Sequence, residues 1–164
     1  MTINELSSLL YDSQLGSSLR ESIYVFPLVE GSHLIGLALS VGLILFIDLR
    51  LLNVFLRNVP VSVILNQLRP WLLLGFAITF ITGGFLFVAE SDKVIHLAIF
   101  PIKLLFILLA GINALWFEIK WGKRVDEWQE NPVFPRSVKF AGIASLILWG
   151  ATVVSGRLIP YLSY

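Results

Sequence analysis

The stretch WLLLGFAITFITGGFLFVA, residues 71–89, decides the fold of this chain because it contains no charged side chain. A bilayer core about 30 Å thick is crossed by roughly 20 apolar residues in a helix that rises about 1.5 Å per residue. No water reaches that core, so the backbone N–H and C=O groups must bond to one another within the segment, which an α-helix allows. Residues 71–89 therefore predict a membrane-spanning helix.

Three other stretches have the same character. They lie at about residues 23–47, 94–117 and 138–159. Of the 164 residues, 57% are hydrophobic and 14% are charged, which excludes a water-soluble globule. The formal net charge of only +1 excludes charge-driven disorder and gives no reason to expect a nucleic-acid partner. We therefore expect an all-α integral membrane protein in which residues 23–164 form a four-transmembrane-helix bundle.

The segments outside the spans predict two short interfacial helices. Residues 1–22 lack the basic start and apolar centre of a cleaved signal peptide, and their leucines recur at helical spacing. We expect them to form an N-terminal interfacial segment with a helix at about residues 3–20 on the membrane surface. A second such helix is expected at about residues 60–68. The charged connection at 118–137 predicts a solvated loop after a helical extension.

The positions of lysine and arginine predict the orientation of the spans. Two long connections carry most of these residues: Arg50, Arg57, Arg69, Lys120, Lys123, Arg124, Arg136 and Lys139. The opposite side has Arg20, Lys93 and Arg157. Because basic loops stay in the cytoplasm, we expect both connections inside and both termini outside.

Ionisable side chains within the spans are the first candidates for function, since each costs about 2.5 to 3.5 kcal/mol in the bilayer. Glu30 and His33 lie three residues apart and so share a helix face. His33 and Lys103 both lie roughly 15 Å from the outer edge of their spans at the helical rise. We expect Glu30 and Lys103 to form a buried ion pair. This reading describes a cofactor-free membrane subunit or a small transporter.

The two histidines suggest a different function. His33 and His96 could ligate one b-type haem, with Gly36 and Ser40 leaving room for the macrocycle. His96 lies about 10 Å nearer the outer surface than His33 unless helix tilt compensates. The haem would serve an electron-transfer or redox-accessory role, with a quinone as one conceivable partner. The alternative is that the small residues only allow close helix packing.

A metal site is the third interpretation. Glu30, His33 and His96, with Glu90 or Asp92, could hold copper or zinc, because a Glu-x-x-His spacing projects both side chains inward. The chain has no cysteine, which excludes thiolate ligands and disulfides. No catalytic motif can be assembled from the remaining residues.

A further group of charges lies at the inner end of the first span. Asp48 and Arg50, with Arg69 from the second span, predict an inner-face charge cluster. Such a cluster is typical of an ion pair that anchors helices at the lipid headgroups, and a lipid or partner site is the alternative.

Several short sequence patterns resemble those of known membrane proteins. They are Pro27-Leu28-Val29-Glu30 leading to His33-Leu34-Ile35-Gly36, Asp48-Leu49-Arg50-Leu51-Leu52, Gly75-Phe76-Ala77 with Thr82-Gly83 and Leu86-Phe87, and Lys103 with Asn113. Over nearly its whole length the chain resembles an uncharacterised family of small bacterial four-span membrane proteins. This resemblance implies a bacterial inner membrane, and the short loops suggest a homo-oligomer or a partner membrane subunit.

A looser likeness rests on the His-Leu early in one span, the Thr-Gly late in the next and the Lys early in the third. In these features the chain is similar to the copper-resistance protein D family and its b-type cytochrome relatives. That likeness implies haem or copper handling at the outer side of the membrane. The chain has two histidines where a dihaem protein needs four, so it departs from the pattern for electron transfer across the bilayer.

Overall fold

The computed structural model describes residues 2–130 and 133–162, and these residues form helices and connecting turns without a strand. The helices are α1 (Ile3–Tyr11), α2 (Gln14–Glu21), α3 (Val25–Leu51), α4 (Val61–Val94), α5 (Ile99–Lys120), the 3₁₀ helix η1 (Gly122–Glu127) and α6 (Arg136–Leu162). Four of them, α3, α4, α5 and α6, are long and apolar enough to cross a membrane. This confirms the all-helical prediction and the four candidate spans.

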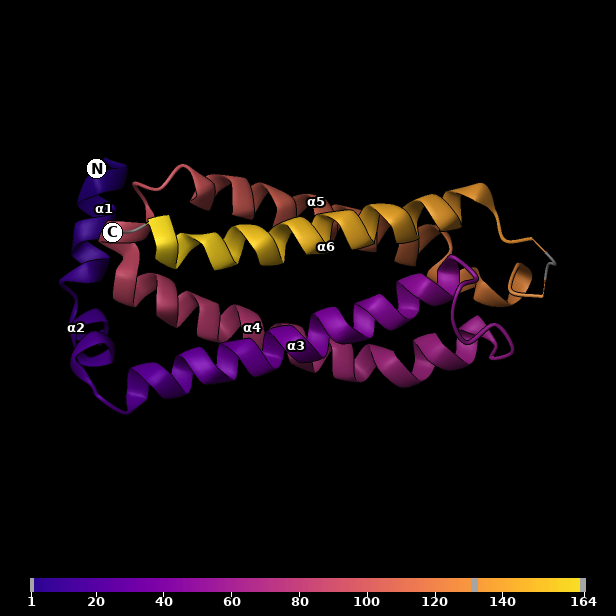
Figure 1. Cartoon of the computed structure of the whole chain (residues 1–164), viewed down its shortest axis with the longest axis horizontal. Helices are drawn as coiled ribbons and strands as arrows, with labels where there is room; N and C mark the ends of the chain where they lie inside the picture. Colours follow the sequence, from indigo (N-terminus) through magenta and orange to yellow (C-terminus); the bar gives the residue numbers. More distant parts are fainter. Residues whose placement is uncertain (1, 131–132, 163–164) are drawn as a thin grey trace.

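The four long helices are arranged as two pairs (Figure 1). Helix α3 packs along α4, and α5 packs along α6, while α3 and α6 join the two pairs. Helices α1 and α2 lie across one end of the molecule, next to the C-terminal end of α6 (Figure 1).

The pair α3–α4 is held at a close crossing of small residues. A Cβ atom on Gly75 would lie 2.9 Å from the backbone nitrogen of Ser40, and one on Gly36 would lie 2.8 Å from Thr79 Oγ1. Ser40 is fully buried, and its hydroxyl donates to the Gly36 carbonyl. Small residues let two helix backbones approach closely, which is how helices associate when no hydrophobic effect drives them together.

Helix α4 differs from the prediction of a separate surface helix at residues 60–68. The helix runs from Val61 through Pro70 to Val94 and is kinked at Glu90, whose backbone angles are not helical. The apolar face formed by Val61, Ile64 and Leu65 is buried in the protein core, so it does not lie on the membrane surface.

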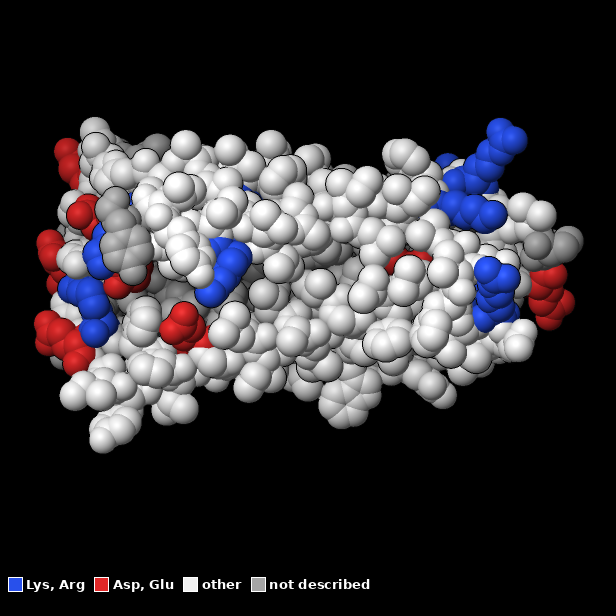
Figure 2. Space-filling view, in the orientation of Figure 1, with Lys and Arg blue, Asp and Glu red and all other residues white. Residues whose placement is uncertain are grey.

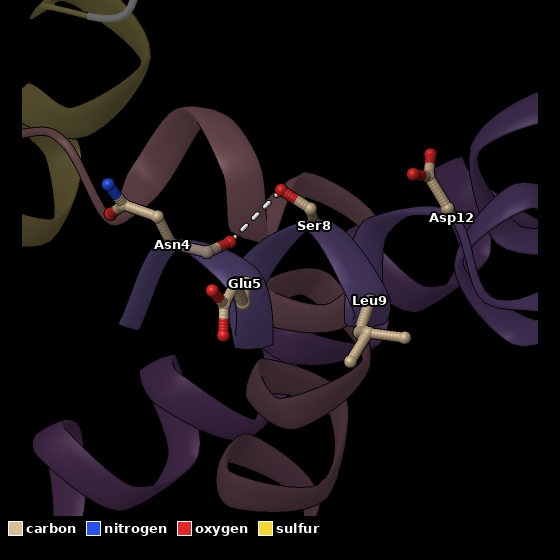
Figure 3. A pocket seen from close by; sticks show the side chains of 5 residues that line it. All are labelled: Asn4, Glu5, Ser8, Leu9 and Asp12. Atoms are coloured by element: carbon tan, nitrogen blue, oxygen red, sulfur yellow. Dashed lines mark hydrogen bonds between the residues drawn. The ribbon is translucent and has the colours of Figure 1, made fainter. Parts of the chain in front are cut away.

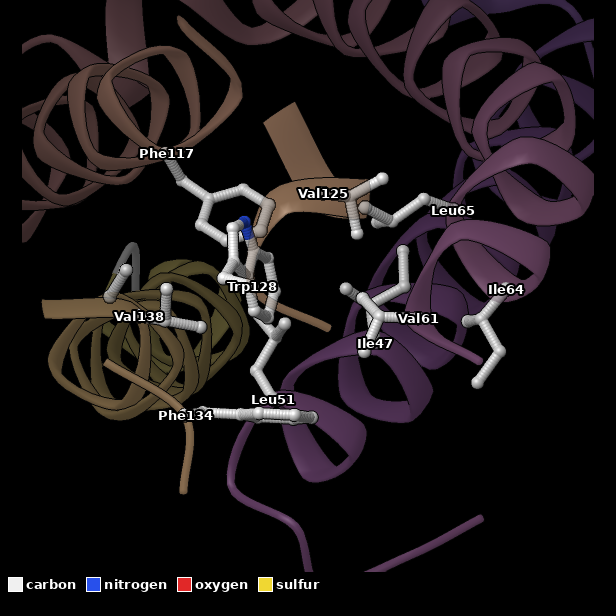
Figure 4. Close-up of a cluster of buried hydrophobic side chains, with 11 residues drawn as sticks. Ile47, Leu51, Val61, Ile64, Leu65, Phe117, Val125, Trp128, Phe134 and Val138 are labelled. Atoms are coloured by element: carbon white, nitrogen blue, oxygen red, sulfur yellow. The ribbon is translucent and has the colours of Figure 1, made fainter. Parts of the chain in front are cut away.

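The connection between α5 and α6 also differs from the solvated loop predicted for residues 118–137. Val125, Trp128 and Phe134 are buried and pack with α3, α4, α5 and α6 in one apolar cluster (Figure 4). Figure 4 shows Trp128 in the middle of this cluster, near Phe117 and Leu51. The charged residues that follow Glu118 in this segment are exposed where the structure describes them, while Trp128 and Phe134 close one end of the bundle.

Helices α1 and α2 are fastened to the end of α4 by polar contacts. Arg20 Nη1 donates to the carbonyls of Tyr11, at 3.2 Å, and Ala89, at 3.0 Å. Its guanidinium also lies 3.6 Å from the centre of the Tyr11 ring. Ser91 Oγ donates to the Ser7 carbonyl at 2.9 Å. Helices α1 and α2 are therefore attached to α4, in addition to having an amphipathic sequence.

The variant Arg20→Ala is expected to release α1 and α2 from α4. Hydrogen bonds made by a charged donor contribute about 1.5 to 3 kcal/mol, so amide hydrogen exchange in α1 should become at least about tenfold faster. The exchange of α5 should not change. Arg157→Ala is the control, because Arg157 contacts Tyr161 within its own helix. Equal exchange in α1 for wild type and Arg20→Ala would refute this role.

Candidate functional site

His33 is held between α3 and α4 in a defined orientation. Its Nδ1 lies 2.9 Å from the Thr79 carbonyl oxygen and 3.1 Å from Thr82 Oγ1. A carbonyl only accepts, so Nδ1 carries the proton that is donated to Thr79, and in the neutral ring Nε2 remains as an acceptor. The ring lies against Gly83, where a Cβ would be 3.1 Å from His33 Cε1. A larger residue than glycine would crowd the imidazole.

Lys103 brings a cation from α5 toward the same region. Its stem lies along Gly156 of α6, where a Cβ would be 3.3 Å from Lys103 Cε and 3.4 Å from Nζ. Both Lys103 and Glu30 are near enough to act electrostatically on His33. His33, Thr79 and Thr82 meet between α3 and α4, and Lys103 and Gly156 meet between α5 and α6. We call these five residues the His33 centre.

The direct ion pair expected between Glu30 and Lys103 is not formed. In the described part of the chain, the side-chain ion pairs join Arg69 to Glu118 and Lys93 to Glu90. Glu30 is exposed on α3, whereas the stem of Lys103 follows α6. Lys103 and Glu30 both act electrostatically on His33, and no closed pair joins them among the described residues.

His96 is not part of this centre. Helix α5 begins at Ile99, later than the predicted start at residue 94, so His96 lies in the turn after α4 and is exposed. His96 precedes Lys103 by seven positions in the sequence, which would correspond to roughly 10 Å along a helix. Among the described residues no group of three His, Cys, Asp or Glu side chains could hold a metal ion. Glu90, a suggested ligand, bonds instead to Lys93 at 2.7 Å.

Gly36 and Ser40 lie where α3 crosses α4 most closely. The space beside them is filled by Gly75 and Thr79 of α4. Their small size therefore serves helix packing, which is the alternative that the sequence left open.

The predicted inner-face cluster is divided between two places. Asp48 and Arg69 line one cavity of about 120 Å³, together with Asn113, Glu118 and Ser145. Arg50 points elsewhere, since its Nε donates to the Val59 carbonyl at 2.9 Å. We call the first group the Asp48 cavity.

Glu118 is the residue of this cavity that sequence reasoning missed. Its Oε2 accepts from Arg69 Nη2 at 2.8 Å, so Arg69 pairs with Glu118 and not with Asp48. The signal that could have found it is depth, because Glu118 ends the third span at the level where Arg69 begins the second.

An apolar layer separates the Asp48 cavity from the His33 centre. The rings of Phe76 and Trp149 lie 4.9 Å apart between their centres, and Ile44 and Ala110 pack with Trp149. Asp48 follows His33 by 15 positions on α3, which corresponds to roughly 22 Å of helix. The two polar groups are therefore distinct sites.

One surface hollow lies at the end of the molecule that carries α1. It has a volume of about 610 Å³, and Asn4, Glu5, Ser8, Leu9 and Asp12 line it (Figure 3). Asn4, Glu5, Ser8 and Leu9 belong to α1 and Asp12 caps its C-terminal end, so the lining comes from one helix and its cap. This feature has the geometry of an open helix face rather than of a binding site.

Comparison with known proteins identifies a family but no activity. A family model described as a family of unknown function (DUF6644) matches residues 14–162, so the chain belongs to that family. No curated protein and no solved structure matches the chain significantly.

Proposed function

We propose that this family member is a four-span protein of a bacterial inner membrane and that it passes protons through the His33 centre, as a small transporter or as the membrane subunit of a larger assembly. It would need no cofactor for this role. The observation that carries the proposal is the half-buried His33, fixed between α3 and α4 by Thr79, with Lys103 of α5 close enough to act on it electrostatically. Ionisable residues inside a membrane protein are costly and mark proton and ion pathways.

The chemistry of the centre suits proton exchange. Imidazole takes up and releases protons near neutral pH, and one ring nitrogen of His33 is fixed by Thr79 while the other stays available. The nearby charges of Lys103 and Glu30 would alter the balance between the two forms of the ring. A group that is held in place on one side and open on the other can accept a proton and pass it on.

The charge distribution supports an orientation with both termini outside the cytoplasm. Figure 2 shows few charged side chains along the middle of the visible face, and acidic residues gathered at the end that carries α1 and α2. The two long basic connections lie at the opposite end (Figure 1). Under the positive-inside rule that end faces the cytoplasm.

Many large apolar side chains on the outer surface of α3, α4, α5 and α6 are exposed, as a lipid bilayer or another membrane chain requires. Examples are Leu73, Leu108 and Ile147. We propose lipid as the main neighbour and a second copy or a partner subunit for part of this surface.

Proton flux into vesicles tests the proposed function. The purified chain is reconstituted into liposomes that hold a pH-sensitive dye, and an inward potential is applied. We expect faster acidification than in empty liposomes and at least a tenfold loss for His33→Asn, whose amide can still donate to Thr79. His96→Asn is the matched control and should retain the flux. Flux equal to that of empty liposomes, or unchanged in His33→Asn, would refute the proposal.

One observation favours a b-type haem in an electron-transfer or redox-accessory role as a second candidate. Histidines that ligate a metal usually donate their other ring N–H to a carbonyl or carboxylate, as His33 does to Thr79. His96 is exposed in its turn, so the second axial ligand would have to come from a partner chain, and a quinone would be a suitable redox partner. The loose similarity to the copper-resistance protein D family points the same way, toward haem before copper or zinc.

An absorption spectrum separates the two candidates. A Soret band in the solubilised protein that disappears in His33→Ala would establish haem and displace the cofactor-free proposal. A spectrum without that band, from cells supplied with haem, would remove the second candidate.

A further inference from the structure

We propose that the Asp48 cavity binds a small monovalent cation with N–H donors, of the ammonium or methylammonium class, on the carboxylate of Asp48. The inference stands apart from the proposed function, because the cavity and the His33 centre share no residue and an apolar layer lies between them.

Asp48 is a buried carboxylate whose hydrogen bonding is incomplete. Its side chain lines the cavity, and the residue is only 4% exposed. Within the part of the chain that the structure describes, Oδ2 has no hydrogen-bond partner. Buried polar atoms in native proteins nearly always have a hydrogen-bond partner, so we expect a hydrogen-bond donor beside Asp48 Oδ2. Ser145 lines the same cavity and supplies no charge.

The basic residues nearby are already engaged. Arg50 donates to the carbonyl of Val59 and to Asn53 Oδ1. Arg69 pairs with Glu118 and donates to the carbonyl of Gly122. Asp48 and Glu118 are the acidic residues of the lining, and Arg69 is the basic one. When all three are ionised, the lining carries a net charge of −1. A carboxylate in an apolar environment needs a counter-charge, which a bound cation would provide.

The rest of the lining favours an ammonium ion over a metal ion. Phe76 and Trp149 present aromatic rings to the same cavity, and cations bind to aromatic faces. Asn113 also lines it, with Nδ2 committed to the Ala141 carbonyl and its oxygen left as an acceptor. Metal ions prefer several charged or imidazole ligands, and the described residues hold no group of three.

The size and position of the cavity suit a small ligand. Its volume of about 120 Å³ is that of roughly four water molecules at about 30 Å³ each. Arg69 and Glu118 form part of its wall, and both side chains are partly exposed. This ion pair lies near the end of α5 that leads into η1, so a cation could approach from the end of the bundle where the basic connections lie.

Calorimetric titration of the detergent-solubilised full chain with methylammonium chloride, at constant ionic strength, tests the inference. We expect saturable binding to wild type and at least a tenfold weaker affinity for Asp48→Asn. The matched control Asp12→Asn changes an exposed aspartate at the end of α1 and should bind as wild type does. Tetramethylammonium, which has no N–H, should not bind.

Three outcomes would overturn the inference: no saturable binding, equal affinity for wild type and Asp48→Asn, or equal binding of tetramethylammonium. Should Asp48→Asn not fold, Ser145→Ala replaces it and is expected to weaken binding at least threefold, with unchanged affinity counting against the site. His33→Asn should bind methylammonium normally. Loss of proton flux and loss of cation binding can therefore be told apart.

Discussion

Replacement of Gly75 with valine is expected to separate α3 from α4 and to destabilise the protein by at least about 3 kcal/mol. The added Cβ would meet backbone atoms of α3, namely the nitrogen of Ser40 at 2.9 Å and the carbonyl oxygen of Gly36 at 3.2 Å. Overpacking of a core costs about 1 to 3 kcal/mol when the neighbouring side chains can move aside. Here the neighbours are backbone atoms of α3, which cannot move aside, so the cost is expected to be at least as large. Unfolding in a denaturing detergent, followed by circular dichroism, measures the loss.

Gly84→Val provides the control for this substitution. Gly84 lies on the same helix, and a Cβ there would have no atom of another element within 4 Å. The free energy of unfolding of Gly84→Val should stay within about 0.5 kcal/mol of the wild-type value, as is usual for surface positions. Equal losses for the two variants would mean that helix propensity, rather than the crossing with α3, explains the effect. The His33 contacts to Thr79 and Thr82 depend on this crossing, so Gly75→Val should also abolish proton flux.

Trp128→Ala is expected to open the end of the bundle where η1 lies, at a cost of about 3 to 5 kcal/mol. Trp128 is 4% exposed, and its Nε1 donates to the Trp121 carbonyl at 3.0 Å. Its ring meets Phe134 edge to face with 5.3 Å between the centres. Alanine would remove the indole from the middle of the apolar cluster in Figure 4 and leave a cavity.

Trp71→Ala is the matched control, because Trp71 is 58% exposed on α4. Its unfolding free energy in detergent should change by less than about 1 kcal/mol. Limited proteolysis adds a local measurement, since the connection between α5 and α6 should become cleavable in Trp128→Ala alone. A connection that is cleaved equally in wild type would contradict its assignment to the core.

Residues on the same helix could be placed from the sequence, because helical geometry is local and regular. The spacing of Glu30 and His33, and the matching depth of His33 and Lys103, need only a rise per residue and a membrane boundary. That these groups gather stays a prediction, and the electrostatic influence of Lys103 and Glu30 on His33 supports it. The described residues show no direct Glu30–Lys103 pair. Spacing along a helix does not say toward which neighbouring helix a long side chain turns.

At the end of the bundle that carries Asp48, the sequence again did not determine which side chains become partners. Arg50 and Arg69 look equivalent as partners of Asp48 in the sequence, yet one bonds to Val59 and the other to Glu118. The aromatic residues among the charges of 118–137 could not be assigned to a core until α3, α4 and α6 supplied the surfaces that bury them. Side-chain partners from distant segments depend on packing, which no local pattern encodes.

Hydropathy and helical periodicity by themselves determined that this chain consists of four long apolar helices, because a segment of the bilayer's thickness must satisfy its own backbone hydrogen bonds. Only the tertiary structure decided which polar groups meet. It placed His33 against Thr79 through a glycine crossing, and among the described residues it left Asp48 Oδ2 buried without a hydrogen-bond partner. Those contacts arise from how two helix pairs fit together, and that fit depends on atoms that lie far apart in the sequence.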